Sequence, residues 1–165
     1  MSDTLAIEID LAAPAWRAAL PEVEAIVRRA AEIAWRMTDR SPGPAELSLM
    51  LTDDATVREL NRTHRGADRA TNVLAFPLGD GPVAAPPVLL GDVVLAFGTV
   101  RREAARDGKP LAAHVSHLVV HGLLHLLGYD HDTAVAAEAM EAIEKTVLDR
   151  LGYADPYDAA IDAAE

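Results

Sequence analysis

The chain has 165 residues, of which 50% are hydrophobic and 25% charged, a size and balance that fit a single globular domain with its own core. It contains no cysteine, which excludes disulfides, thiolate metal sites and a cysteine nucleophile, and no apolar stretch reaches the roughly 20 residues of a membrane span. The net charge of −11 argues against nucleic-acid binding. Most of this charge lies in residues 130–165, where ten acids against Lys145 and Arg150 give a net charge of −8. Residues 1–129 therefore have a net charge of only −3.

The first half of the chain predicts two strands that alternate with two helices. Apolar and polar side chains alternate over residues 5–11, the period of a strand with one buried face. After a short turn around Pro14, an apolar stripe at helical spacing begins near Pro21, since proline is favoured in the first turn of a helix. A Pro- and Gly-rich break ends this helix, residues 47–51 alternate as a second strand, and a second helix ends near Arg65.

The second predicted helix and the residues after it carry a local positive charge. Residues 58–69 have a charge of +2, with four arginines against two acids: Arg58, Arg62, Arg65 and Arg69 against Glu59 and Asp68. This pattern is consistent with a cationic face, and equally with a solvated helix face that carries scattered arginines.

The second half predicts two more strands followed by three helices. The strands cover residues 72–76 and 88–97, and the Gly- and Pro-rich stretch 78–87 joins them as a loop. Gly91 lies inside the second of these strands and indicates a bulge or a close approach of another backbone. Three helices follow at about 98–106, 110–127 and from 133, the last with a buried stripe of Met140, Ile143, Val147 and Leu151.

This order of elements predicts an α+β fold in one domain, with a mixed four-stranded sheet and helices packed on it. We expect the domain to cover residues 1–153 and the acidic stretch 154–165 to form a mobile tail. The N-terminal residues show no basic region followed by an apolar run, so no secretory signal is visible and the cytoplasm is the expected compartment.

Histidines are concentrated in the second half of the chain, where five of the six lie between residues 114 and 131. His117, His121 and His125 are spaced by four and therefore share one face of a helix. Their neighbours are apolar, which predicts a helix that runs through the core, where an unpaired polar nitrogen costs about 1–3 kcal/mol. A shared metal ion would give several of these rings a partner, so the predicted fold includes a metal-binding helix in the C-terminal half.

The spacing predicts one zinc ion per chain, held by His121, His125 and His131. His121 and His125 lie one helical turn apart, and Gly128 should end the helix in a left-handed conformation that returns His131 to them. Three protein nitrogens leave a fourth position for water, the arrangement of a catalytic zinc site.

Two more histidines precede the predicted zinc ligands. His117 shares their helix face, and we predict it as a catalytic residue, either an acid or base at the rim or a hydrogen-bonding partner of a ligand. His114 is as consistent with a structural role as with a functional one.

The spacing His-x-x-x-His-x-x-Gly-x-x-His is also that of metzincin proteases, in which a glutamate follows the first histidine and serves as general base. Gly122 occupies that position here, and the sequence places no other carboxylate to replace it. An alternative function is another zinc hydrolase, such as a peptidase or an amidase. The absence of the glutamate general base weighs against it.

The string from His121 to His131, HGLLHLLGYDH, resembles the signature of the YbeY endoribonuclease family. Ala75 departs from the family pattern, in which serine is common at this position. The resemblance covers about residues 47–151 and includes Leu60-Asn61, Arg65-Gly66, TNVLAFP at 71–77, GDVV at 91–94, and His114 with HLVV at 117–120.

The resemblance implies a zinc-dependent endonuclease specific for single-stranded RNA. Such an enzyme acts in ribosomal RNA maturation, at the 3′ end of the small-subunit RNA, and in ribosome quality control. It implies His121, His125 and His131 as zinc ligands and Arg65 as a catalytic residue. The implied partners are ribosomal RNA and the ribosome or a small-subunit ribosomal protein, with no membrane. Seven aromatics are few for base stacking, so a protein partner is expected to direct specificity.

Three alternatives stay open at this point. Arg65 suits a scissile phosphate because guanidinium binds phosphate oxygens in a bidentate way, but it also fits a surface arginine near a helix end. Asp130 is predicted either to orient a histidine through its distal nitrogen or to cap a turn before Asp132. The whole protein also fits a non-catalytic ribosome-assembly factor in which the metal only pins the C-terminal helices.

Overall fold

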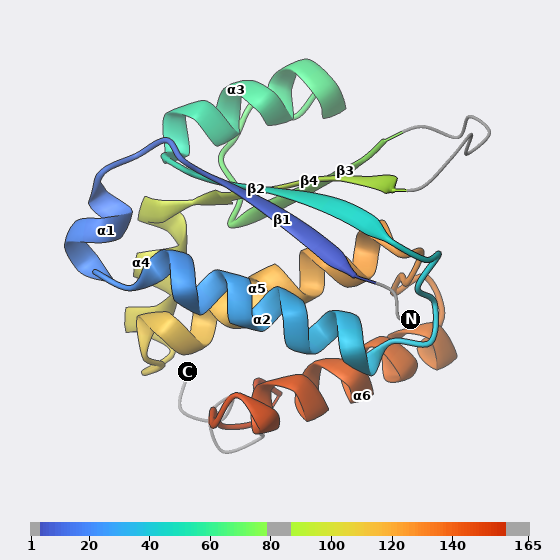
Figure 1. The fold of residues 1–165 in the computed structure, drawn as a ribbon. Coiled ribbons are helices and arrows are strands. Elements are labelled where there is room, and N and C mark those ends of the chain that lie inside the picture. The colour runs from blue at the N-terminus through green and yellow to red at the C-terminus, as the bar shows by residue number, and fades with distance from the viewer. Residues whose placement is uncertain (1–3, 79–86, 158–165) are drawn as a thin grey trace.

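The computed structural model describes residues 4–78 and 87–157 and has an α+β architecture built around one sheet (Figure 1). The strands are β1 (Leu5–Leu11), β2 (Ala45–Thr52), β3 (Val73–Pro77) and β4 (Val88–Ala96). They lie in the order β1-β2-β4-β3. β1, β2 and β4 are parallel, whereas the edge strand β3 is antiparallel to β4, so the sheet is mixed, as predicted.

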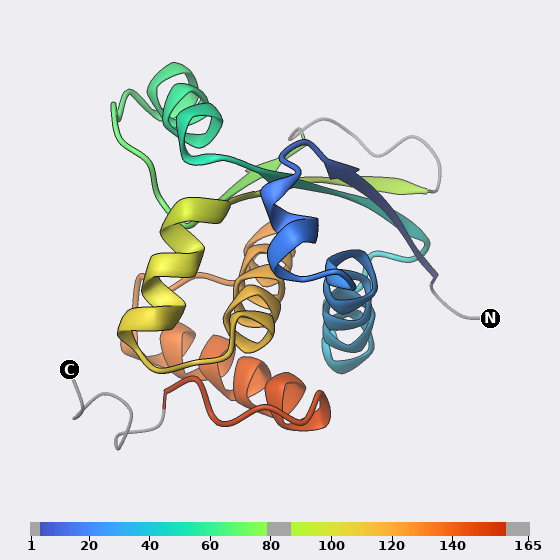
Figure 2. The same cartoon turned by 90° about the vertical axis from the view of Figure 1, so that its left-hand side faces the viewer.

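The helices lie on both faces of this sheet. They are α1 (Ala15–Ala19), α2 (Val23–Met37), α3 (Asp54–Arg65), α4 (Phe97–Arg106), α5 (Leu111–Leu126) and α6 (Ala134–Arg150). α3 lies on one face, and α2, α5 and α6 lie on the other (Figures 1 and 2). α5 contacts β3, β4, α2, α4 and α6, which places it at the centre of the domain.

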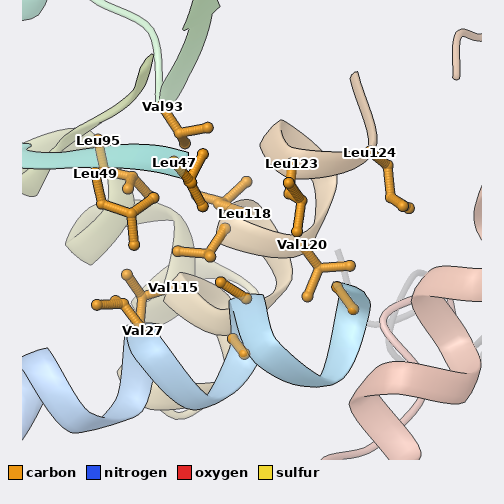
Figure 3. Packing of buried hydrophobic residues seen from close by; sticks show 14 of the residues in the cluster. Val27, Leu47, Leu49, Val93, Leu95, Val115, Leu118, Val120, Leu123 and Leu124 are labelled. Carbon is orange, nitrogen blue, oxygen red and sulfur yellow. The ribbon is translucent and has the colours of Figure 1, made fainter. Parts of the chain in front are cut away.

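The main core fills the space between the sheet and the helices α2 and α5 (Figure 3). α5 is surrounded by other elements, so its sequence is apolar on nearly every side, as expected for a helix through a core. A smaller apolar cluster lies beneath α3 on the opposite face and contains Val57, Leu74, Val94 and Ala96. The core side chains shown in Figure 3 include Val27, Leu47, Leu49, Val93, Leu95, Val115, Leu118, Val120, Leu123 and Leu124.

Gly91 confirms the predicted irregularity inside β4. The pairing of β2 with β4 shifts by one residue next to it, which is a β-bulge. Gly91 has a φ of +137° and pairs with Pro77 of β3, and a Cβ at this position would lie 2.1 Å from the Phe76 carbonyl oxygen. Only glycine fits such an approach of two backbones.

The short helix α1 replaces the turn that was predicted around Pro14. Trp16 fixes this segment, because its side chain is fully buried and its Nε1 donates to the Thr52 carbonyl at 2.9 Å. Its ring also meets Phe97 edge-on, with the ring centres 5.1 Å apart. A helix of five residues is too short to show a stripe in the sequence, so its position follows from this tertiary anchor.

The other boundaries lie close to the predicted ones, and the fold class is confirmed. The helix predicted from Pro21 begins at Val23. Most of the predicted loop 78–87 and most of the predicted tail 154–165 lie outside the described residues. Within the described ranges, no helix is both long and apolar enough to cross a bilayer.

Candidate metal centre

The side chains of His121, His125 and His131 meet at the C-terminal end of α5. One ring nitrogen of each lies within 4.8 Å of those of the other two. The rings of His121 and His131 stack with their centres 4.8 Å apart, and His125 lies edge-on at 5.2 Å from His121 and 5.4 Å from His131. His121 is partly buried and the other two are exposed, so the cluster is open to solvent on one side.

The chain reverses at Gly128, and this reversal brings His131 back to the helix. Gly128 has a φ of +95°, which confirms the predicted left-handed conformation. The Tyr129 N–H donates to the Leu124 carbonyl at 3.1 Å and so closes the end of the helix. Tyr129 itself is buried, and its hydroxyl lies 2.9 Å from Oγ1 of Thr38. The turn that carries His131 is therefore anchored in the core.

The surroundings of His125 favour a neutral imidazole. Burial lowers the pKa of His125, and the nearby His121 and His131 lower it further because like charges repel. A neutral imidazole keeps a lone pair for a metal ion. Three imidazole nitrogens within reach of one another, with one open side, are a donor set that fits zinc.

Arg65 of α3 lies across a hollow from the histidines. Its Nη2 donates to the Ala75 carbonyl at 3.1 Å, and its guanidinium carbon lies 5.6 Å from the centre of the Phe76 ring. Ala75 thus lies in the wall of this hollow. The hollow has a volume of about 220 Å³ and is lined by Arg65, Asn72, Val73, Ala75, His121, Gly122 and His125.

The other arginines of α3 are engaged in ion pairs. Arg58 pairs with Asp68 at 2.7 Å, and Arg62 pairs with Glu59. The two pairs use both acids of residues 58–69, so the local charge of +2 belongs to Arg65 and Arg69. What is left near the hollow is the guanidinium of Arg65, which contacts a carbonyl rather than a carboxylate among the described residues.

Gly122 occupies the position of the protease glutamate. It lies against β4 as well as the hollow. A Cβ at this position would lie 2.7 Å from Cγ1 of Val93 and 3.0 Å from its Cγ2. The close packing of α5 on β4 therefore leaves no space for a longer side chain at residue 122. A metzincin-type glutamate at this position would therefore collide with Val93.

A buried carboxylate, Glu144 of α6, lies behind the histidine cluster. Its Oε2 lies 2.7 Å from Nδ1 of His121, its Oε1 lies 3.1 Å from Nε2 of His117, and the Tyr157 hydroxyl donates to Oε1. Burial alone would favour the neutral acid, but hydrogen bonds from His117, His121 and Tyr157 outweigh it and lower the pKa of Glu144 to about 2. Glu144 is therefore an anion at neutral pH.

Sequence reasoning missed Glu144 and considered Asp130 for the orienting role. Oδ1 of Asp130 instead accepts from the Asp132 N–H at 3.0 Å, which is the turn-capping alternative. A signal for Glu144 was present, since it lies on the stripe of α6 that includes Met140, Val147 and Leu148, all of them buried. An acid within an apolar stripe indicates a buried partner.

The structure places His117 one turn further from the hollow than His121. Its Nε2 contacts Glu144, and together with His114 it lines a separate cavity of about 210 Å³. This location favours the hydrogen-bonding role among the two predicted for His117. His114 is buried, and its Nε2 lies 2.8 Å from Oε1 of Glu103, which also accepts from Nδ2 of Asn72. His114 therefore links α5 to α4 and to the wall of the hollow.

Comparisons with known proteins match most of the chain to one family. A family model described as endoribonuclease YbeY matches residues 13–152. The endoribonuclease YbeY of Rhodopseudomonas palustris strain BisB18 is 52% identical over 156 residues, which cover 92% of each chain. That of Paramagnetospirillum magneticum is 52% identical over 161 residues, which cover 95% of this chain and 98% of the relative.

A solved structure shares the fold. The solution structure of TM1509 from Thermotoga maritima has a TM-score of 0.56 at 22% identity and covers 94% of this chain and 99% of that one. At this identity the likeness concerns the fold alone. The family match, in contrast, spans Arg65 and all three clustered histidines together with most of the sheet and helices, and the chain therefore belongs to the endoribonuclease YbeY family.

Proposed function

We propose that this protein is a zinc-dependent endoribonuclease that cuts single-stranded ribosomal RNA in the cytoplasm, in maturation of the small-subunit 3′ end and in ribosome quality control. The observation that carries the proposal is the convergence of His121, His125 and His131 at a hollow that His121 and His125 line together with Arg65. Membership of a family of endoribonucleases supports the reaction class.

His121, His125 and His131 would hold one zinc ion per chain. When bound, zinc supplies a Lewis acid for a phosphoryl oxygen and lowers the pKa of bound water towards about 7. The lowered pKa of His125 supports this role, because a neutral ring is available as a ligand at neutral pH. The exposed side of the cluster gives a phosphodiester access to the ligands.

Arg65 would bind the scissile phosphate from the opposite wall of the hollow. Its contact with the Ala75 carbonyl restrains the guanidinium. The remaining N–H groups can donate to two phosphate oxygens at once and stabilise the negative charge that develops in the transition state. An alanine side chain at residue 75 leaves the wall without the hydroxyl that serine would supply.

The ribosome or a small-subunit ribosomal protein is proposed to direct the enzyme to its substrate. Tyr129 is buried against Thr38, and Phe97 packs on Trp16. The buried ring of Tyr129 therefore offers no stacking surface for an RNA base, which supports the view that specificity comes from a partner.

The two competing functions, a peptidase and a non-catalytic assembly factor, make different predictions. A peptidase would need a general base, and the packing of Gly122 on Val93 leaves no room for the glutamate that metzincins use. A non-catalytic assembly factor would need the metal only to hold the C-terminal helices, so that His121→Ala would unfold the protein and Arg65→Ala would have no effect on RNA processing.

The test uses the zinc-loaded full chain with a single-stranded small-subunit 3′ RNA fragment, the same sequence as a duplex, and casein. We expect cleavage of the single strand only. Arg65→Ala should keep its fold and zinc content and lose at least about a hundredfold in cleavage rate, as for removal of a transition-state donor. Arg58→Ala on the same helix, whose arginine is paired with Asp68, is the matched control.

Two outcomes would contradict the proposal. Cleavage of casein instead of RNA would favour a peptidase. A wild-type protein that binds zinc but cleaves no RNA, together with unfolding of His121→Ala, would favour the non-catalytic assembly factor.

A further inference from the structure

Glu144 is a fully buried carboxylate that holds two histidines of another helix. Its side chain has 0% exposure, and each of its oxygens faces a ring nitrogen: Oε2 at 2.7 Å from Nδ1 of His121 and Oε1 at 3.1 Å from Nε2 of His117. A carboxylate only accepts hydrogen bonds, so the nitrogens that contact it carry the hydrogen atoms.

This contact determines which nitrogen of His121 can bind a metal. A neutral imidazole has one N–H and one lone pair. Because Nδ1 of His121 donates to Glu144, the lone pair is on Nε2, at the other side of the ring. The same hydrogen bond fixes the plane of a ring that stacks on His131 and lies edge-on to His125.

We propose that Glu144 is a positioning residue for the metal centre, which sets the orientation and the tautomer of His121 so that its Nε2 serves as the metal-binding atom. This rests on the proposed function, since it assigns a partner to one of the three proposed zinc ligands. Carboxylates behind metal-binding histidines raise the basicity of the ring, and their loss lowers metal affinity by about 10–100-fold.

The second oxygen of Glu144 is also occupied, which keeps the carboxylate in place. His117 of α5 and Tyr157, from the segment after α6, both contact Oε1, and their rings lie edge to face at 5.4 Å. The segment that carries Tyr157 is itself held, because Pro156 is buried and its carbonyl accepts from Nζ of Lys109 at 3.3 Å. Glu144 is thus restrained from two sides and has one orientation towards His121.

A purely structural role explains Glu144 less well. The other buried residues of α6 are Met140, Val147 and Leu148, and an apolar residue would extend this stripe without the desolvation of a charge. Replacing buried ion pairs with apolar residues is often neutral or stabilising. A buried carboxylate can accept a hydrogen bond from the proposed metal ligand His121, which a leucine cannot do.

The first test is the tautomer of His121 in the metal-free wild-type protein. Long-range ¹H–¹⁵N NMR correlations at pH 7.5 distinguish a ring protonated on Nδ1 from one protonated on Nε2. We expect the hydrogen on Nδ1 of His121. A hydrogen on Nε2 would overturn the proposal, and no substitution is needed for this measurement.

The second test is the zinc affinity of Glu144→Gln, measured by competition with a chromophoric chelator. We expect zinc binding to weaken by about 10–100-fold. Glu138→Gln removes the same charge from an exposed position of the same helix and should bind zinc like the wild type. Tyr157→Phe removes one donor to Glu144 and should weaken zinc binding by a smaller factor, about two- to fivefold.

The outcomes separate this proposal from the proposed function. Equal zinc affinities of Glu144→Gln and Glu138→Gln would overturn the positioning role. If Glu144→Gln does not fold, the tautomer of His121 and the zinc affinity of Tyr157→Phe test the positioning role instead. A wild-type chain that binds no zinc would overturn the proposed function, whereas the tautomer of His121 in that chain still shows whether Glu144 sets the ring.

Discussion

Gly122 of α5 and Val93 of β4 are packed so closely that the helix backbone lies directly on the side chain of the strand. A Cβ at residue 122 would lie 2.7 Å from Cγ1 of Val93, well inside ordinary van der Waals contact. Because of this approach, the residues on either side of Gly122 are held near the edge of the sheet. His121 and His125 thereby line the same hollow as Ala75 of β3.

Gly122→Ala is expected to destabilise the fold by about 1–3 kcal/mol, since a methyl group must displace Val93 in a filled core. Urea unfolding of the metal-free protein measures the change. Val93→Ala makes room, so the double variant should lose less free energy of unfolding than the two single variants together. Strict additivity of the two changes would show that the contact is not tight.

His131→Ala is expected to remove stoichiometric zinc without unfolding the domain. His131 is exposed and lies in a turn that is anchored by Tyr129, so the fold does not depend on its ring. Loss of a hydrogen-bond partner of a ligand lowers zinc affinity by about 10–100-fold, and loss of the ligand itself should lower it further. Elemental analysis and thermal unfolding with and without a chelator measure the two effects.

His64→Ala is the control for this variant, because His64 is exposed and lies outside the cluster, against Phe76. It should bind zinc like the wild type. Full zinc content in His131→Ala, or its absence from the wild-type protein, would refute the assignment of the three ligands.

His114 is expected to make the stability of the metal-free protein depend on pH. Burial lowers its pKa, and the hydrogen bond with Glu103 only partly opposes this. Below about pH 6.5 the unfolded chain therefore takes up a proton that the folded chain does not, and stability falls as the pH falls. The contribution of the neutral His114 ring to the free energy of unfolding is fully present above that pH.

Urea midpoints at pH 7.5 and pH 5.5, compared between the wild type and His114→Gln, measure this contribution. His125 has a lowered pKa as well and acts in the same direction, so the variant should retain a smaller pH dependence than the wild type. Identical pH dependences in the two proteins would show that His114 does not contribute.

Gly91→Ala is expected to destabilise the protein by more than about 3 kcal/mol, because it combines backbone strain at positive φ with a collision against the Phe76 carbonyl. Gly43→Ala is the matched control, since Gly43 also has a positive φ but no atom within 4 Å of its Cβ position. That variant should lose only about 1–2 kcal/mol. Similar losses in both variants would rule out the close approach at Gly91.

The parts of this structure that the sequence predicted are those that depend on neighbours in the chain. The stripe of α2, the alternation of β1 and the reversal at Gly128 all follow from short-range patterns, and each is present. Of the buried stripe predicted for α6, Met140 and Val147 are buried, whereas Ile143 and Leu151 are half-buried. The approach of the three histidines has the same origin, because one helical turn and one glycine suffice for it.

What the sequence could not show depends on contacts between distant segments. The helix α1 exists because Trp16 binds the Thr52 carbonyl, and the partner of His121 is Glu144 because α5 and α6 pack together. Arg65 entered through the family resemblance, since no pattern in the residues joins it to histidines so far along the chain. Their common hollow became visible only in three dimensions.

The guanidinium and the imidazoles of this site belong to opposite layers of the molecule. The helix α3, which ends at Arg65, lies on one side of the sheet, and α5, which carries His121 and His125, lies on the other (Figure 1). The three side chains line one hollow with Ala75 of the edge strand β3. A slip of β3 by one residue along β4 would move the Ala75 carbonyl, to which Arg65 donates, about 3.4 Å along the strand and would turn the side chains of β3 to the opposite face of the sheet. Gly91 admits a single alignment opposite Pro77. The distance between phosphate anchor and metal ligands is thus encoded in how two strands are paired, as much as in the histidine motif.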